Sequence, residues 1–251
     1  MSTTPQNIYD DPAFFAGYKK LRETSSGLNE ALEQPALWSL LPNQLDGLRV
    51  LDLGCGFGDF ARAARERGAR EVLALDVSAN MLARAAELTH DKAIHYVRMS
   101  IEQFRNAGAL FDLVVSSLAL HYVGHYADAV QQVAQSLAPG GVFIFSVEHP
   151  MCTALPSQQW VRDAENNPLH WPVDDYHKEG PRNTKWFVDG VIKHHRTVET
   201  YVNALLDCGL QLRRLLEPQP QAEKAARRVP ELDLHRRRPP FLLLAAEKPN
   251  V

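Results

Sequence analysis

The stretch that decides the fold is Val50-Leu51-Asp52-Leu53-Gly54-Cys55-Gly56-Phe57-Gly58, an apolar run that leads directly into a glycine-rich turn. The next apolar run ends in a carboxylate, Asp76. Glycines let the backbone come close to a ligand where a Cβ atom would collide. A carboxylate at the end of the second strand can accept hydrogen bonds from both hydroxyls of a ribose. Together the two features predict a nucleoside site.

The spacing within the turn indicates which nucleoside is bound. Dinucleotide dehydrogenases carry G-x-G-x-x-G, whereas Asp59 occupies the third glycine position here. Asp52 precedes Gly54-x-Gly56-x-Gly58, and its carboxylate would repel a pyrophosphate but suit a cationic ligand. This arrangement resembles motif I of class I S-adenosylmethionine (SAM) dependent methyltransferases. The resemblance implies an enzyme with SAM as cofactor and S-adenosylhomocysteine (SAH) as product.

The resemblance also implies cofactor contacts. Asp52 would lie near the methionine part of SAM, and Asp76 would bind the ribose. Val77 and Met81 would lie beside the adenine, although Met81 is equally explained as a core residue. Ser100 stands where the family often has Asp. The implied cofactor-binding residues are Tyr18, Arg22, Asp52, Gly54, Cys55, Gly56, Phe57, Asp76, Val77, Met81, Ser100, Ile101 and Ser116.

Residues after the fourth and fifth expected strands would face the transferred methyl group. The stretch from Phe111 to Tyr122 resembles motif IV of the family, which puts His121 where substrate and methyl group meet. A neutral imidazole there could accept a proton from a hydroxyl or a ring N–H, and a structural role is the alternative. The candidate catalytic residues are His121, Glu148 and His149, and the candidate substrate-binding residues are Tyr9, Tyr122, Trp186 and His195.

Composition bounds the class of protein. The chain has 251 residues, 45% apolar and 23% charged, which is enough for a sizeable core. Its net charge of −3 argues against nucleic-acid binding through bulk electrostatics. It has neither an apolar run long enough to span a membrane nor a secretory signal in residues 1–6. Three scattered cysteines suit a reduced, cytoplasmic protein, with Cys55 a packing residue rather than a nucleophile.

Short apolar runs alternate with helical stretches along the chain. Strands are expected at 49–54, 72–76, 94–98, 111–116, 142–147, 210–216 and 241–246, and helices at 59–67, 79–88, 126–137 and 197–208. Such alternation predicts a doubly wound parallel sheet. The last two strands fit the antiparallel pair that ends the methyltransferase sheet. We therefore expect an α/β, Rossmann-like, seven-stranded class I methyltransferase fold in a single domain spanning 1–251.

Two segments outside the sheet are expected to cover the site. Residues 8–46 begin with an aromatic, helical stretch that resembles the lid of small-molecule methyltransferases, and a packing helix is the alternative. Residues 149–196 show no strand–helix rhythm, yet they hold Trp160, Trp171 and Trp186. A long segment after a central strand is usually functional. We expect a substrate cap there, with a structural or dimer-forming insertion as the alternative.

Two further groupings carry weaker signals. The basic residues Arg227, Arg228, His235, Arg236, Arg237 and Arg238 could grip an acidic substrate, but the pattern is more typical of a solvated loop. The histidines of the insertion lack H-E-x-x-H spacing and the chain lacks paired C-x-x-C, so no metal is expected.

The acceptor is expected to be a small molecule. Net acidity and the aromatic insertion favour a planar or apolar compound over nucleic acid or a membrane. The stretches 9–18 and 189–197 resemble small bacterial enzymes of secondary metabolism, including the toxoflavin-type azapteridine N-methyltransferase. The resemblance implies N-methylation of a planar heteroaromatic secondary metabolite, with O-methylation of a small acid or phenol as the alternative. An NAD-dependent oxidoreductase and a non-catalytic SAM-binding protein are alternatives from other classes.

Overall fold

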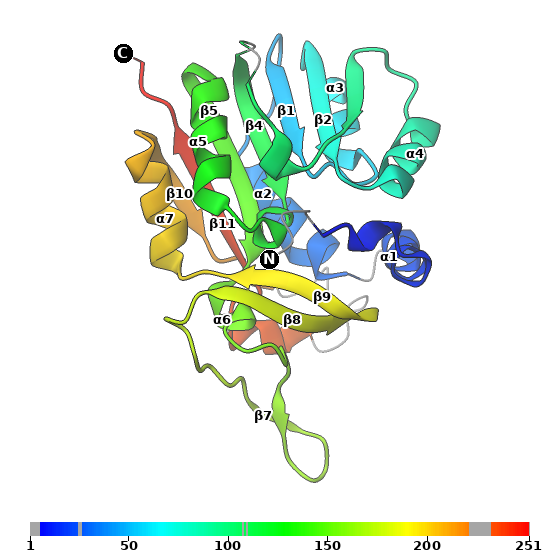
Figure 1. Cartoon of the computed structure of the whole chain (residues 1–251), viewed down its shortest axis with the longest axis vertical. Coiled ribbons are helices and arrows are strands. Elements are labelled where there is room, and N and C mark those ends of the chain that lie inside the picture. The colour runs from blue at the N-terminus through cyan, green and yellow to red at the C-terminus, as the bar shows by residue number, and fades with distance from the viewer. Residues whose placement is uncertain (1–5, 25–26, 107, 109, 221–231, 251) are drawn as a thin grey trace.

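A sheet of seven strands forms the centre of the protein (Figure 1). The computed structural model describes residues 6–24, 27–106, 108, 110–220 and 232–250. The strand order is β10-β11-β5-β4-β1-β2-β3, with β11 antiparallel to both neighbours, as expected for a class I methyltransferase sheet. The strands are β1 (Arg49–Leu53), β2 (Glu71–Asp76), β3 (Ile94–Arg98), β4 (Phe111–Ser117), β5 (Leu137–Glu148), β10 (Gln211–Leu216) and β11 (Phe241–Glu247).

Both faces of the sheet are covered by helices. Successive side chains of each strand point to opposite faces, so each strand contributes to the packing on both sides. Leu51 and Leu53 pack with residues of α5 and α7 on one face, and Val50 packs with residues of α2 and α3 on the other. Strands covered on both faces have apolar runs without alternation, as the sequence has here. The helices are α1 (Pro12–Thr24), α2 (Gln34–Ser39), α3 (Asp59–Glu66), α4 (Ala79–Leu88), α5 (Tyr126–Ser136), α6 (Pro150–Thr153) and α7 (Val198–Asp207).

The N-terminal segment is attached to the end of β2. The helix expected from Ile8 divides into the short turn η1 (Ile8–Asp10) and α1. α1 begins at Pro12, a position that suits proline because the N–H groups of a first helical turn have no partner within the helix. Ser78 caps α4 by accepting the Met81 N–H at 3.1 Å. Asp10 accepts hydrogen bonds from the Ser78 hydroxyl at 2.6 Å and the Asn80 N–H at 3.0 Å, so η1 binds the start of α4.

The 149–196 segment shows no strand–helix rhythm in the sequence, yet the structure gives it regular elements. It contains α6 and two antiparallel hairpins, formed by β6 (Val161–Arg162) with β7 (Pro168–His170) and by β8 (Gly180–Trp186) with β9 (Val188–His195). Both lie beyond one end of the main sheet (Figure 1). Buried side chains of β8 and β9 include Arg182, Thr184 and Lys193. Because these inward positions are polar, the apolar alternation that identifies a strand is absent.

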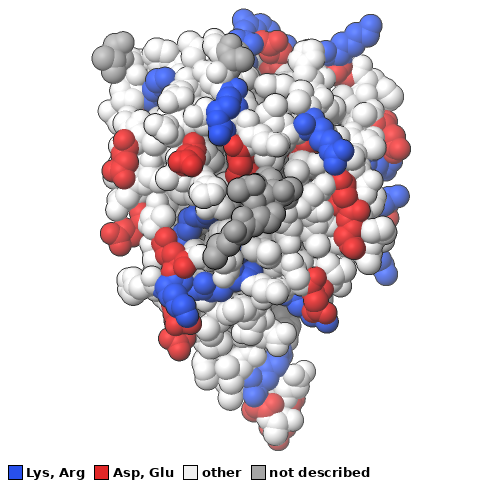
Figure 2. Space-filling model, in the orientation of Figure 1, with Lys and Arg blue, Asp and Glu red and all other residues white. Residues whose placement is uncertain are grey.

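The surface carries both signs of charge. Figure 2 shows basic and acidic side chains interspersed over one face. Within the described ranges, no helix combines the length and apolar character needed to cross a membrane. Arg227 and Arg228 of the basic stretch lie outside the described residues.

Gly58 allows the turn after β1 to pack against β3. Its φ is +74°, and a Cβ there would lie 2.0 Å from the Tyr96 hydroxyl. Gly47 has the same φ, but a Cβ there would meet nothing within 4 Å. Gly47→Ala should therefore cost only the left-handed backbone penalty of about 1–2 kcal/mol. We expect Gly58→Ala to lower the free energy of unfolding by more than Gly47→Ala does, as measured by denaturant titration.

The contact with Tyr96 is the source of the additional loss. Tyr96→Phe introduced together with Gly58→Ala should recover part of it, because the nearest clashing atom is then removed. Equal losses for the alanine variants at positions 47 and 58 would contradict this explanation.

Candidate active site

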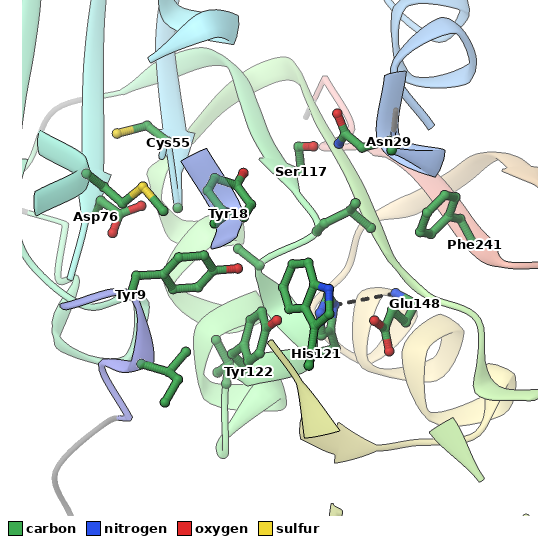
Figure 3. A pocket seen from close by; sticks show the side chains of 18 of the residues that line it. Tyr9, Tyr18, Asn29, Cys55, Asp76, Ser117, His121, Tyr122, Glu148 and Phe241 are labelled. Atoms are coloured by element: carbon green, nitrogen blue, oxygen red, sulfur yellow. Dashed lines mark hydrogen bonds between the residues drawn. The ribbon is translucent and has the colours of Figure 1, made fainter. Parts of the chain in front are cut away.

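A cavity of about 530 Å³ lies beyond the carboxyl ends of the central strands (Figure 3). Its wall combines the glycine turn after β1, the end of β2, segments after β3, β4 and β5, the N-terminal segment and parts of the 149–196 insertion. Open α/β sheets bind ligands at this edge. The cavity is therefore the candidate active site.

The glycine turn forms one end of the cavity. The N–H groups of Gly54 and Cys55 both donate to the Leu75 carbonyl, at 2.8 and 2.9 Å, and this joins the turn to β2. Gly54 has φ of +79°, and a Cβ there would lie 2.4 Å from the Ala119 Cβ. Only glycine allows this backbone path. Gly54, Cys55 and Phe57 lie on the cavity wall as expected.

Asp52 presents an unsatisfied carboxylate to the site. The residue is 2% exposed and lines the cavity, and its Oδ2 has no hydrogen-bond partner among the described residues. Burial, with smaller contributions from Asp76 and Asp59, raises the pKa of Asp52 to about 8. A buried acid of this kind becomes stable as a carboxylate when a cation lies beside it.

Asp76 is held in place by the backbone around it. Its Oδ2 accepts the Gly56 N–H and its Oδ1 the Ser78 N–H, each at 2.9 Å. Burial raises the pKa of Asp76 despite these hydrogen bonds. A carboxylate has about four lone-pair positions, so acceptor capacity remains for two ligand hydroxyls.

The residues expected beside an adenine lie on the same wall. Val77, Met81, Ser100 and Ile101 all line the cavity. The Ser100 hydroxyl accepts the Gln103 N–H at 3.2 Å and so caps the short turn η3 (Ile101–Gln103). Ser100 therefore stabilises the turn η3.

Arg22 connects the N-terminal segment to the start of α3. Its guanidinium pairs with Asp59 at 2.6 Å and Glu30 at 2.9 Å and donates to Asn29 at 2.7 Å. The positive charge lies beside a helix N-terminus, the end of a helix that attracts anions. This places Arg22 where it can contact an anionic group that approaches the glycine turn.

Aromatic side chains from distant parts of the chain meet over the cavity. The ring of Tyr9 lies 5.3 Å from that of Tyr18 and 6.0 Å from that of Tyr122, measured between centroids. Trp186, from the end of β8, lies 6.1 Å from Tyr18. These four residues line the cavity, and Figure 3 shows the three tyrosines grouped around its middle. Edge-to-face contacts of this kind form a rigid, apolar wall.

His121 and Glu148 form a second polar part of the wall. The Glu148 N–H donates to His121 Nδ1 at 3.4 Å (Figure 3). Burial lowers the pKa of His121 to about 4, so the ring is neutral at pH 7. Although burial opposes ionisation, Lys193, at 2.6 Å, is the main group that holds the pKa of Glu148 at about 2. Gln158 donates to the same carboxylate at 3.0 Å.

Four predicted site residues do not lie on the cavity wall. Gly56 contributes its N–H to Asp76, and the Ser116 hydroxyl donates to the Leu53 carbonyl at 2.9 Å between strands. His149 caps α6 and contacts Glu217 at 2.8 Å. His195 lies 2.8 Å from both the Thr153 hydroxyl and the Tyr176 carbonyl. The two histidines thus have their ring nitrogens engaged in holding the insertion together.

Several cavity residues were not predicted. Ser117, rather than Ser116, reaches the wall, and it donates to the buried Glu33 at 2.9 Å. Burial raises the pKa of Glu33 to about 7. Other unpredicted wall residues include Asn29, Glu30, Met99, Glu102, Cys152, Gln158 and Phe241. They come from elements far apart in sequence and carry no local pattern that would identify them. Trp171 and Arg238, which also line the wall, were noted in the sequence only as members of the aromatic insertion and of the basic stretch.

The sequence model of a family described as a methyltransferase domain matches residues 51–145. The fold is similar to the crystal structure of an S-adenosylmethionine-dependent methyltransferase from Mesorhizobium loti, with a TM-score of 0.81. The two sequences are 46% identical, and the match covers 88% of this chain and 100% of that one. The chain belongs to the S-adenosylmethionine-dependent methyltransferases. It is an enzyme of that class and uses SAM as its cofactor, so the NAD-dependent alternative is set aside.

Two other relatives add context to this methyltransferase. An uncharacterized protein of Haemophilus influenzae is 34% identical over 253 residues, covering 96% of this chain and 97% of the relative. The malonyl-[acyl-carrier protein] O-methyltransferase of Enterobacter lignolyticus is 48% identical over 98 residues, 39% of this chain and 38% of that enzyme.

The cavity of the methyltransferase suits SAM. The unpartnered Oδ2 of Asp52 offers an acceptor for an ammonium group, and Asp76 retains acceptor capacity for ribose hydroxyls. The absence of a Cβ at Gly54 leaves the backbone room to pass Ala119. The protein groups at the places where the cofactor's amino group and ribose would bind are carboxyl groups, which agrees with a cationic ligand.

The raised pKa of Asp52 makes cofactor binding pH-dependent. With a pKa of about 8, this carboxyl is mostly protonated at pH 7 in the free enzyme. An ammonium group beside it favours the ionised form, so SAM binding near pH 7 should release about one proton. SAM affinity should consequently increase as pH rises toward 8. Calorimetry in buffers of different ionisation enthalpy measures the release directly.

Asp52→Asn is the matched control for this titration. The variant should bind SAM more weakly and release no proton. If it releases as many protons as the wild type, the titrating group is another residue, with Asp76 the first to test.

Proposed function

We propose that this methyltransferase transfers the methyl group of SAM to a ring nitrogen of a small, planar heteroaromatic molecule. The observation that carries the proposal is a single cavity that runs from the glycine turn to the wall of Tyr9, Tyr18, Tyr122 and Trp186. Flat aromatic walls favour a planar ligand through stacking and edge contacts. The resemblance to toxoflavin-type N-methyltransferases supports the same class of acceptor.

The polar groups of the cavity favour an acceptor that needs no general base. His121 Nδ1 accepts a backbone N–H, so the proton of the neutral ring is on Nε2. His121 then acts as a hydrogen-bond donor toward the substrate, rather than as the proton acceptor expected from the sequence. Glu148 is paired with Lys193 and is a weak base. A ring nitrogen with a free lone pair needs neither group as a general base.

SAM supplies an already activated methyl group when it is bound. The protein therefore contributes mainly position and the exclusion of water, which together are worth up to about 7–11 kcal/mol of barrier. We assign the covering roles to residues 8–46 as a lid and residues 149–196 as a substrate cap. Gln6, two residues before the lid, supports this assignment, because its side chain ties the chain there to the cap through hydrogen bonds with the Gly190 carbonyl and the Ile192 N–H.

O-methylation of a small acid is the second candidate. It is supported by the local likeness to malonyl-[acyl-carrier protein] O-methyltransferases. An ionised carboxylate also needs no general base, so the arrangement of His121 and Glu148 fits this acceptor as well.

A panel of acceptors separates the two candidates. Purified enzyme is incubated with isotopically labelled SAM and with pyridines, pyrimidines, pteridines, benzoates and phenols, and SAH formation is measured. We expect turnover with the heteroaromatic members and a methyl group on ring nitrogen by NMR. Turnover confined to carboxylates or phenols would replace the N-methylation proposal, and SAM binding without any turnover would contradict both.

His121 should act as a hydrogen-bond donor in the reaction. We expect His121→Ala to lower kcat by about 10–100-fold through loss of this hydrogen bond, with SAM affinity nearly unchanged. His121→Gln retains an N–H donor and should recover part of the rate.

The pH profile distinguishes a donor from a base. Because burial holds the pKa of His121 at about 4, the wild-type kcat should show no His121-dependent change above pH 5. A rise in kcat between pH 6 and 7 that is present in the wild type and absent in His121→Ala would instead identify His121 as the general base.

A further inference from the structure

Arg238 is a buried cation in the wall of the cavity. It lies just before β11, is 9% exposed and lines the cavity together with Cys152 and Trp171. The sequence favoured a solvated loop for this residue over a contact with an acidic substrate, and its burial shows the solvated loop to be wrong at this position. Its neighbour Arg237 differs, because it is exposed and donates to the Pro168 and Leu169 carbonyls.

No acid among the described residues forms a salt bridge with Arg238; Glu148 acts on it through its charge, but its carboxylate is already paired with Lys193. Its Nη1 donates to Cys152 Sγ at 2.8 Å, and its buried Nε has no partner. The guanidinium stacks on Trp171, 3.9 Å from the ring centroid. The Cys152 sulfur lies 3.4 Å from the Pro239 carbonyl, a contact that a thiol can make as donor and a thiolate cannot. Burial raises the pKa of this thiol to about 12, so it carries no compensating charge at neutral pH.

The other buried cations of this region have polar partners. Lys193 is paired with Glu148, and Arg182 and Arg196 donate to backbone carbonyls, whereas the buried Nε of Arg238 has no partner. An arginine remains charged even when buried, and an unpaired buried charge is destabilising. Arg238 is thus a fixed positive charge that a ligand of the opposite charge would neutralise.

The position of Arg238 assigns this anion to the acceptor rather than to the cofactor. Two strands, β5 and β4, separate β11 from β1, which carries Asp52 and the glycine turn. Arg238 contacts α6, which follows β5. The charge therefore lies on the side of the cavity formed by the insertion, away from the turn where the cofactor's methionine part is expected.

We propose that Arg238 binds a carboxylate on the acceptor molecule, so that the substrate is a planar acid bound by the guanidinium that Trp171 supports. The inference rests on the proposed function, because it names the charge of the molecule that enters the same cavity. Guanidinium and carboxylate groups match in charge and geometry and form strong, charge-assisted hydrogen bonds. The flat Trp171 ring extends the aromatic wall on this side.

Matched acids and amides test the inference without knowledge of the natural substrate. The probes are nicotinate with nicotinamide, quinaldate with quinaldamide, and benzoate with benzamide, titrated by calorimetry in the presence of SAH. In the wild type we expect at least one acid to bind about 10–100-fold more tightly than its amide, as expected for a hydrogen bond to a charged group. Arg238→Gln should remove this preference by weakening the acid alone, and Arg238→Lys should retain part of it.

Arg237→Gln is the control, because it removes an adjacent arginine whose side-chain contacts among the described residues are two backbone carbonyls and the Trp160 ring. It should leave the preference and the SAH affinity unchanged. The inference is wrong if no acid binds more tightly than its amide, if Arg238→Gln weakens acid and amide equally, or if Arg237→Gln has the same effect as Arg238→Gln.

Failure of the proposed function gives a different result. N-methylation of neutral heteroaromatics without any acid preference would overturn the carboxylate inference and leave the function intact. An Arg238-dependent acid preference, with methyl transfer to oxygen only, would uphold the carboxylate inference and overturn N-methylation.

Discussion

The site depends on one backbone constraint, the turn that follows β1. The Gly54 and Cys55 N–H groups share the Leu75 carbonyl, and the positive φ at Gly54 turns the chain past Ala119 with no room for a Cβ. This brings the end of β1, with Asp52, next to the end of β2, with Asp76. The raised pKa of both acids results mainly from burial in this corner. A cationic nucleoside cofactor relieves that cost, which links the turn geometry to SAM chemistry.

The covering of the site is fastened at polar points rather than by apolar packing alone. Asp10 binds the start of α4, Arg22 pairs with Asp59 at the start of α3, and the buried Glu33 accepts hydrogen bonds from Ser117 and Ser146 at the ends of β4 and β5. Each contact joins the N-terminal segment to a different strand end of the sheet. The tyrosines of that segment are thereby held over the same cavity that the sheet edge forms.

Charge is distributed unevenly between the two sides of the cavity. The side near β1 and β2 has Asp52 with an unpartnered oxygen, and the side near α6 has Arg238, which forms no salt bridge among the described residues because Glu148 is paired with Lys193. Burial disfavours the charged forms of Asp52 and Asp76 and leaves Arg238 as an unpaired charge, and ligands of opposite charge would relieve both costs. The pattern is consistent with two molecules of different charge that bind end to end, one a sulfonium cofactor and the other an acid.

The sequence by itself determined the main sheet, the helices α3, α4, α5 and α7 beside it, and most residues of the cavity wall around the glycine turn, because those features are local. Apolar runs, the glycine turn, the Ser78 cap and the acids at strand ends each act within a few residues. Only the tertiary structure decided the acceptor side. The hairpin β8–β9 has polar inward positions that hide its strands, His149 and His195 are used in structural hydrogen bonds, and Arg238 meets Cys152 from 86 residues away. Whether a charged residue is solvated or buried depends on what packs around it, and a linear pattern does not contain that information.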